Sequence, residues 1–138
     1  MPYLVDTDLV IDHLGQVKEA TSLLEQLAPE GIAISIITYM EAYQGVLRSP
    51  NLKEAKAKFQ AFRKSLPVLP FSLTIAKRCA LLRERLKQEG KRVKARALDL
   101  MNAAIALEHD LTFVTHNRED YQDIPHLKLY PPIEKHKT

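Results

Sequence analysis

The chain opens on the stretch YLVDTDLVIDHL, residues 3–14. Its first three residues are apolar and suited to extended backbone, which predicts a short buried strand. Apolar residues then recur at helical spacing over residues 9–14, before a glycine, which predicts a short helix. The carboxylates of Asp6 and Asp8 therefore follow the point where a strand ends.

Strands and helices alternate along the rest of the chain. The predicted strands span residues 32–36, 67–70, 111–115 and 127–129, and the predicted helices include residues 17–27, 40–47, 52–65, 72–89 and 97–109. This alternation is typical of an α/β fold in which a mostly parallel central sheet lies between helical layers. Ligands of such folds bind beyond the carboxyl ends of the strands.

Length and composition indicate one globular domain. The chain has 138 residues, of which 46% are hydrophobic and 27% charged, and this size supports one sizeable core. We expect the domain to span residues 1–130 and a polar tail to follow at 131–138. Cys79 is the only cysteine, which excludes an internal disulfide. The sequence contains neither a membrane-length apolar run nor a secretory signal pattern, so we expect a cytoplasmic protein.

Positive charge is concentrated in one segment of the chain. Residues 77–96 contain nine Lys and Arg residues and two Glu residues, whereas the whole chain has a net charge of +3. Such a segment attracts a polyanion, or it forms an ordinary solvated helix face. The sequence leaves both interpretations open.

Acidic or amide side chains follow three of the predicted strands or begin the helix before one of them. Asp6 follows the first strand, Glu41 follows the second, and Asp99 opens the helix at 97–109. Asn117 and Asp120 follow the strand at 111–115. If these side chains meet at one edge of the sheet, each close pair of carboxylates repels by roughly 4 kcal/mol at 4 Å and an effective dielectric of 20. A hard divalent cation would relieve that repulsion, and ligands that are all oxygen favour Mg²⁺ or Mn²⁺.

Each of these residues also has a purely structural interpretation. Asp6 or Asp8 is suited to capping the first helix. Thr38 and Glu41 have the spacing of a capping box. Asp99 would interact favourably with a helix dipole. However, Asp99 is surrounded by residues typical of a core, and a partly buried carboxylate requires a hydrogen bond, an ion pair or a metal.

Four segments together resemble the PIN domain, and in particular the VapC-type toxin ribonucleases of toxin–antitoxin modules. They are Leu4 to Asp8, Ser35 to Glu41, Asp99 to Ala106 and Thr115 to Tyr121, and their order and spacing match over essentially the whole chain. The resemblance implies a three-layer α/β/α sandwich whose acidic pocket binds Mg²⁺ or Mn²⁺ and cleaves RNA.

The resemblance also implies roles for individual residues. Asp6, Glu41 and Asp99 match the metal-binding acids, Asp120 joins them as a catalytic acid, and Thr7, Asp8, Thr115 and Asn117 match supporting positions. The RNA substrate, which in this family is a tRNA, rRNA or mRNA, would be held through its phosphates by the basic segment. The residues expected to do so are Arg83, Lys87, Lys91, Arg92, Lys94 and Arg96. A cognate VapB-type antitoxin and a homodimer are the implied partners.

Two positions depart from the family pattern. The family usually has Asn or Ser where this chain has Asp8, and it often has an acid where this chain has Asn117. Either Asp8 or Asp120 is therefore the candidate to replace the missing acid.

Three other interpretations are open. The spacing of Asp6 and Asp8 imitates the nucleophile motif of haloacid dehalogenase-type phosphatases, although Glu41 would have no role there. A response-regulator receiver would also gather acids around Mg²⁺, but it requires an aspartate after the third strand, and residues 67–71 contain none. The third is a PIN fold that only binds a partner and has no catalytic activity.

Overall fold

The computed structural model describes residues 2–133. Four parallel strands form the central sheet in the order β3-β2-β1-β4. These strands are β1 (Tyr3–Val5), β2 (Ile32–Ser35), β3 (Val68–Leu69) and β4 (Thr112–Val114). The α/β fold and the parallel sheet predicted from the sequence are confirmed.

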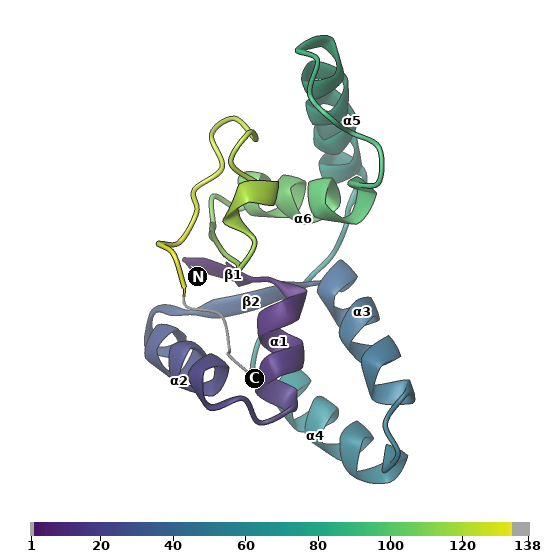
Figure 1. The fold of residues 1–138 in the computed structure, drawn as a ribbon, viewed down its shortest axis with the longest axis vertical. Helices are drawn as coiled ribbons and strands as arrows, with labels where there is room; N and C mark the ends of the chain where they lie inside the picture. Colours follow the sequence, from purple (N-terminus) through teal and green to yellow (C-terminus); the bar gives the residue numbers. More distant parts are fainter. Residues whose placement is uncertain (1, 134–138) are drawn as a thin grey trace.

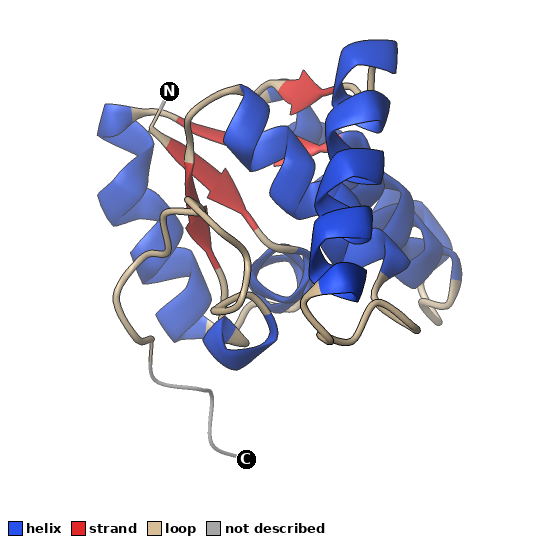
Figure 2. Ribbon diagram, turned by 90° about the horizontal axis from the view of Figure 1, so that it is seen from above, coloured by secondary structure: helices blue, strands red, loops and turns tan. Residues whose placement is uncertain are grey.

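Six α-helices connect and cover the strands (Figures 1 and 2). They are α1 (Thr7–Leu14), α2 (Lys18–Leu27), α3 (Ile36–Leu47), α4 (Leu52–Lys64), α5 (Leu73–Gln88) and α6 (Ala97–Glu108). Two short 3₁₀ helices, Ala28–Glu30 and Arg118–Asp120, complete the described elements. None of the described helices is both long enough and apolar enough to span a bilayer.

The sheet has a separate hydrophobic core on each face, because neighbouring strand residues point to opposite sides. Leu4 and Phe113 pack into one core with the buried faces of α5 and α6. Val5 and Val114 pack into the other core with α1, α2 and α4. Figure 1 shows α6 on one side of the sheet and α1 and α2 on the other. This arrangement is the three-layer sandwich.

Two predictions about secondary structure are wrong. The second strand ends at Ser35, whose hydroxyl accepts a hydrogen bond from the Thr38 N–H (3.0 Å) and caps α3. Thr38 therefore lies inside the helix, and it does not form a capping box with Glu41. Residues 127–129 do not form a strand: the described chain there makes a single parallel bridge, between Leu129 and Phe113.

The end of the predicted domain is only partly described. Ile133, which was expected to lie in the polar tail, packs against the core beneath α1 and α2. Residues 134–138 lie outside the described part of the chain. The boundary at residue 130 stays a prediction.

Candidate functional site

The predicted acidic residues line one cleft at the carboxyl end of the sheet. The cleft has a volume of about 270 Å³ and is formed by the residues that follow β1 and β4 and by residues of α1, α3 and α6. Its lining residues are Asp6, Thr7, Asp8, Ile11, Glu41, Gln44, Asp99, Asn117, Asp120 and Tyr121. Five of these carry a carboxylate, and none of them is basic. The topology of the parallel sheet therefore brings together residues that are far apart in the sequence.

Asp6 is the most deeply placed of these acids and is 7% exposed. Its carboxylate accepts hydrogen bonds from the Thr7 N–H (2.8 Å) and from the Thr115 hydroxyl (2.6 Å). Burial raises the pKa of Asp6 to about 6, and the negative charges of Asp8 and Asp99 act in the same direction. The two hydrogen bonds favour the charged form and partly oppose this shift in pKa. The Asp6 carboxylate therefore ionises less readily than that of an exposed aspartate.

Glu41 is held by the hydroxyl of Thr7, which in turn contacts the hydroxyl of Thr38. The Thr7 hydroxyl donates to Glu41 Oε1 (2.7 Å), and the two oxygens Thr7 Oγ1 and Thr38 Oγ1 are 3.0 Å apart. These contacts connect the start of α1 to the first two turns of α3. Thr7, which the resemblance placed among the supporting residues, thus connects the Asp6 segment to Glu41.

Asn102 lies beneath the cleft and is not among its lining residues. It lies three residues after Asp99 in α6, so both side chains lie on the same side of the helix. In the structure Asn102 is buried and accepts a short hydrogen bond from the Ser35 hydroxyl. Because Ser35 also caps α3, this contact fixes the start of α3 against α6.

Asp99 is oriented by Tyr121, which the sequence motif contained but to which we assigned no role. The Tyr121 hydroxyl donates to Asp99 Oδ1 (3.0 Å), and its ring packs against Phe113 with centroids 4.7 Å apart. Burial and the nearby negative charges of Asp6 and Asp99 raise the pKa of Tyr121 far above its usual range. Tyr121 therefore remains a hydrogen-bond donor at any physiological pH.

The two positions that depart from the family pattern contact each other. The Asn117 side-chain amide donates to Asp8 Oδ2 (2.9 Å) at the mouth of the cleft. Thr115, also a predicted supporting residue, accepts a hydrogen bond from the Asn117 backbone N–H (3.0 Å) through its hydroxyl. The turn after β4 is thereby connected both to Asp8 and, through Thr115, to Asp6.

The prediction for Arg96 requires correction, because its side chain is not available to RNA. Arg96 is 3% exposed, and its guanidinium group forms two hydrogen bonds to the Asp123 carboxylate (2.9 and 2.8 Å). Asp123 was not identified from the sequence as the partner of Arg96, because a run of basic residues does not indicate which of its side chains is buried. The other five predicted RNA-binding residues are exposed: Arg83, Lys87, Lys91, Arg92 and Lys94.

The donor set of the cleft fits a hard divalent cation. Asp6, Glu41 and Asp99 supply carboxylate oxygens within one cleft, which is the donor chemistry that Mg²⁺ and Mn²⁺ prefer. Burial is the main cause of the raised pKa of Asp6, and the negative charges of Asp8 and Asp99 add to it. Within residues 2–133, no three Asp, Glu, His or Cys side chains are already close enough to share one ion. Binding would therefore require carboxylate side chains to rotate toward the ion.

Comparison with known proteins gives one consistent family. The PIN domain family matches residues 3–127 of the chain. Ribonuclease VapC2 of Rickettsia felis is 30% identical to the chain over 131 residues, which cover 94% of this chain and 96% of that protein.

Solved structures show the same similarity. The structure of VapBC2 from Rickettsia felis, bound to a DNA fragment from their promoter, contains a chain that matches with a TM-score of 0.82 and 29% identity, covering 94% of this chain and 98% of that one. FitAcB from Neisseria gonorrhoeae matches with a TM-score of 0.79 and 25% identity, covering 94% and 97% of the two chains.

Proposed function

Because the chain belongs to the PIN domain family, we propose that it is a VapC-type endoribonuclease that cleaves RNA at the acidic cleft. The resemblance inferred from the four sequence segments is confirmed. The observation that carries the proposal is the cleft itself, in which five carboxylates from four segments of the chain gather without a basic lining residue.

Asp6, Glu41 and Asp99 would hold the Mg²⁺ or Mn²⁺ ion. When bound, the ion would supply positive charge for the scissile phosphate and lower the pKa of a water molecule. Thr7 and Thr115 keep the carboxylate of Asp6 directed into the cleft. These hydrogen bonds reduce the freedom that a flexible carboxylate would otherwise lose on binding an ion.

The residue that accepts the proton of the attacking water is Asp99 or Asp120. One oxygen of Asp99 is already occupied by the Tyr121 hydroxyl. Asp120 is exposed at the rim, and among the described residues no side chain donates to its carboxylate. We therefore assign the proton-accepting role to Asp120, within reach of solvent.

The exposed basic residues after α5 are the proposed contact for the RNA backbone. Lys91, Arg92 and Lys94 lie in the loop that leads into α6, the helix that carries Asp99. The backbone of this loop is connected through Arg96 to the carbonyl of Asp120 in the cleft. Contacts of this kind hold phosphates without reading the bases, so they position a strand and leave sequence choice to other features.

Cleavage of RNA with and without a divalent ion tests the proposal. We expect the protein to cut single-stranded RNA with Mg²⁺ or Mn²⁺, and Asp6→Asn to abolish cutting. Asp110→Asn is the matched control, since Asp110 is an exposed acid that pairs with Lys128 outside the cleft. Cleavage that persists in EDTA or in Asp6→Asn would refute the metal-dependent mechanism. RNA binding without any cleavage would favour the non-catalytic PIN interpretation, and phosphatase activity without action on RNA would favour the dehalogenase-type interpretation.

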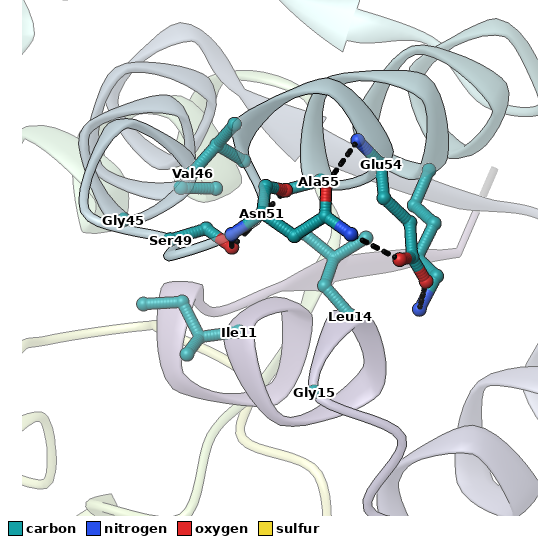
Figure 3. A pocket seen from close by; sticks show the side chains of 11 residues that line it. Ile11, Leu14, Gly15, Gly45, Val46, Ser49, Asn51, Glu54 and Ala55 are labelled. Atoms are coloured by element: carbon teal, nitrogen blue, oxygen red, sulfur yellow. Dashed lines mark hydrogen bonds and ion pairs between the residues drawn. The ribbon is translucent and has the colours of Figure 1, made fainter.

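We also propose that a VapB-type antitoxin binds beside the cleft. A groove of about 350 Å³ lies between α1 on one side and α3 and α4 on the other (Figure 3). Ile11 lines both this groove and the acidic cleft, so the two lie next to each other. Apolar side chains such as Leu14 and Val46 line the groove. An apolar partner segment that entered it would reach the cleft and block access of RNA.

A homodimer is the remaining proposed partner. Ile36 and Met40 on α3, Leu73 at the start of α5 and Leu98 at the start of α6 are large exposed apolar residues. Burying such side chains between two copies is favourable by about 25 cal/mol per Å² of apolar surface. Light scattering of the wild type and of Met40→Glu tests this, because the charged substitution is expected to shift a dimer toward monomer.

A further inference from the structure

Arg96 occupies an unusual place for a charged side chain. It immediately precedes α6, and its own carbonyl accepts the Leu100 N–H (2.9 Å) in the first turn of that helix. Ala95 before it has a φ of 62°, a left-handed conformation that a residue with a Cβ seldom adopts. The backbone therefore makes a sharp turn that directs the Arg96 side chain into the protein, where it is buried.

The Arg96 guanidinium group connects the loop before α6 to the turn that contains Asp120 and Asp123. It forms a bidentate ion pair with Asp123, and its Nη2 also donates to the Asp120 carbonyl (2.7 Å). Its Nη1 donates to the Arg92 carbonyl (2.7 Å). A planar group with several fixed donors can satisfy all of these acceptors at once, whereas an ammonium group cannot match the same directions.

A buried ion pair of this kind is weak evidence for a gain in stability, because removing the charges from water costs free energy that the pair only partly recovers. Here the Nε of Arg96 is also buried without a hydrogen-bond partner. The presence of a buried arginine is better explained by where its hydrogen-bond acceptors lie. One acceptor is the backbone of Asp120, which lines the cleft, and Arg96 itself begins the helix that carries Asp99.

We propose that Arg96, fixed by Asp123, is a positioning residue that holds Asp99 and Asp120 in the cleft and connects them to the basic loop of Lys91, Arg92 and Lys94. This inference rests on the proposed ribonuclease function and replaces the expectation that Arg96 contacts RNA. Because the Arg92 carbonyl is bound to the same guanidinium group, the position of the loop and the position of the acids depend on each other.

The test compares two variants, Arg96→Lys and Asp123→Asn. Lysine keeps the charge but loses the bidentate geometry, and asparagine keeps the shape but loses the carboxylate. Arg78→Lys is the matched control, since Arg78 forms an exposed ion pair with Glu108 (2.9 Å) at the opposite end of α6. We expect both Arg96→Lys and Asp123→Asn to lower kcat by about tenfold or more while KM for RNA changes less than about threefold, and the control to leave both constants unchanged.

A direct RNA contact would give a different result. In that case Arg96→Lys would leave kcat intact, and Asp123→Asn would have little effect on either constant. Loss of a true phosphate contact, such as that proposed for Lys94, is expected to raise KM. It should also reduce the slope of log binding constant against log salt concentration by about one.

Amide hydrogen exchange supplies a readout that needs neither RNA nor metal. The Asp120 N–H donates to the Asn117 carbonyl (3.0 Å) and the Tyr121 N–H to the Arg118 carbonyl (2.9 Å). Both amides should exchange about tenfold faster in Asp123→Asn, whereas amides in β1 should not change. Unchanged exchange and kcat in Asp123→Asn would overturn the inference. A wild type that cuts no RNA would refute the proposed function instead, and the exchange experiment would still decide whether Arg96 fixes this loop.

Discussion

The side-chain amide of Asn117 donates a hydrogen bond to Asp8 across the mouth of the cleft, although 109 positions separate the two residues in the chain. The resemblance to the PIN domain implied a neutral residue at position 8 and an acid at position 117. This chain has the opposite arrangement. Because the two side chains touch, the exchange keeps one acid and one neutral donor at the same point. We infer that Asp8 is the residue that replaces the acid missing at position 117.

The first prediction concerns a swap of these two residues. Asn117→Asp alone places two carboxylates in contact, which should lower the free energy of unfolding by about 1–2 kcal/mol at neutral pH. Asp8→Asn alone removes one negative charge and should weaken Mn²⁺ binding. The double variant restores both the charge and the hydrogen bond, so its Mn²⁺ affinity should return to within about threefold of the wild type. Titration calorimetry with Mn²⁺ and thermal unfolding measure these effects. If the effects of the two single substitutions simply added in the double variant, Asp8 would not replace the acid missing at position 117.

The sequence was sufficient to predict the layers, the parallel sheet and the acidic edge, because each depends on local periodicity and on the position of acids after strands. It misplaced the boundary at Ser35. The apolar, β-branched residues around Ser35 extended the predicted strand, whereas the Ser35 hydroxyl caps a helix that begins at the next residue. The hydroxyl of Ser35 also contacts Asn102, 67 positions away, and this contact is not visible in the local pattern.

Contacts between residues far apart in the sequence also explain why some residues were missed. Arg96 belongs to a run of basic residues that are otherwise exposed, and its burial depends on Asp123, which lies 27 positions later. Tyr121 was assigned no role, because its contribution to the cleft depends on Asp99 lying within hydrogen-bond distance of its hydroxyl. A periodic pattern reports the side of an element that is buried. It does not report which partner a buried polar group finds.

The second prediction concerns pH and Asp6. Its pKa is raised to about 6 in the folded chain, above the value near 4 of an unfolded aspartate. The folded state therefore binds the proton more tightly, so the stability associated with protonated Asp6 is present below about pH 4 and is lost as the pH rises through 6. The ionised side chain costs on the order of 2–3 kcal/mol above that range.

Asp6→Asn removes this cost but loses one of the two hydrogen bonds. In EDTA at pH 7.5 the variant should be more stable than the wild type by about 1–2 kcal/mol. Near pH 4 the cost of the buried charge is gone and the lost hydrogen bond remains, so the wild type should be at least as stable as the variant. Urea unfolding at both pH values measures it. Asp110→Asn serves as the control and should show no such dependence on pH. A variant that is less stable than the wild type at pH 7.5 would show that the hydrogen bonds outweigh the cost of burying the charge.

The third prediction concerns the hydroxyl of Tyr121. Tyr121→Phe keeps the ring contact with Phe113 and removes only the hydrogen bond to Asp99. Because Asp99 then rotates more freely, kcat for RNA should fall by about 3–10-fold, while the free energy of unfolding should change by less than about 1.5 kcal/mol. Tyr3→Phe is the matched control, since the Tyr3 hydroxyl also donates to a carboxylate, that of Glu30, but on the surface. Equal kinetic effects in the two variants would contradict a role for Tyr121 in the cleft.

The fourth prediction concerns Gly45, which lies within α3 and lines the groove proposed for the antitoxin (Figure 3). A Cβ added at Gly45 would meet no atom within 4 Å. Alanine also loses less backbone entropy than glycine when a helix forms. Gly45→Ala should therefore stabilise the free protein by about 0.5–1 kcal/mol. Gly45→Glu should fold equally well but place a charge beside the apolar side chains of the groove, and burying that charge against a partner costs several kcal/mol.

Together the two variants separate folding from partner binding. If an apolar antitoxin segment occupies the groove, Gly45→Glu should weaken antitoxin binding by about 10-fold or more and leave RNA cleavage by the free protein unchanged, because Gly45 does not line the cleft. Calorimetric titration of each variant with the purified antitoxin measures the first effect, and an RNA cleavage assay with added antitoxin measures the second. Full inhibition of Gly45→Glu at the wild-type antitoxin concentration would show that the partner blocks the cleft by another route.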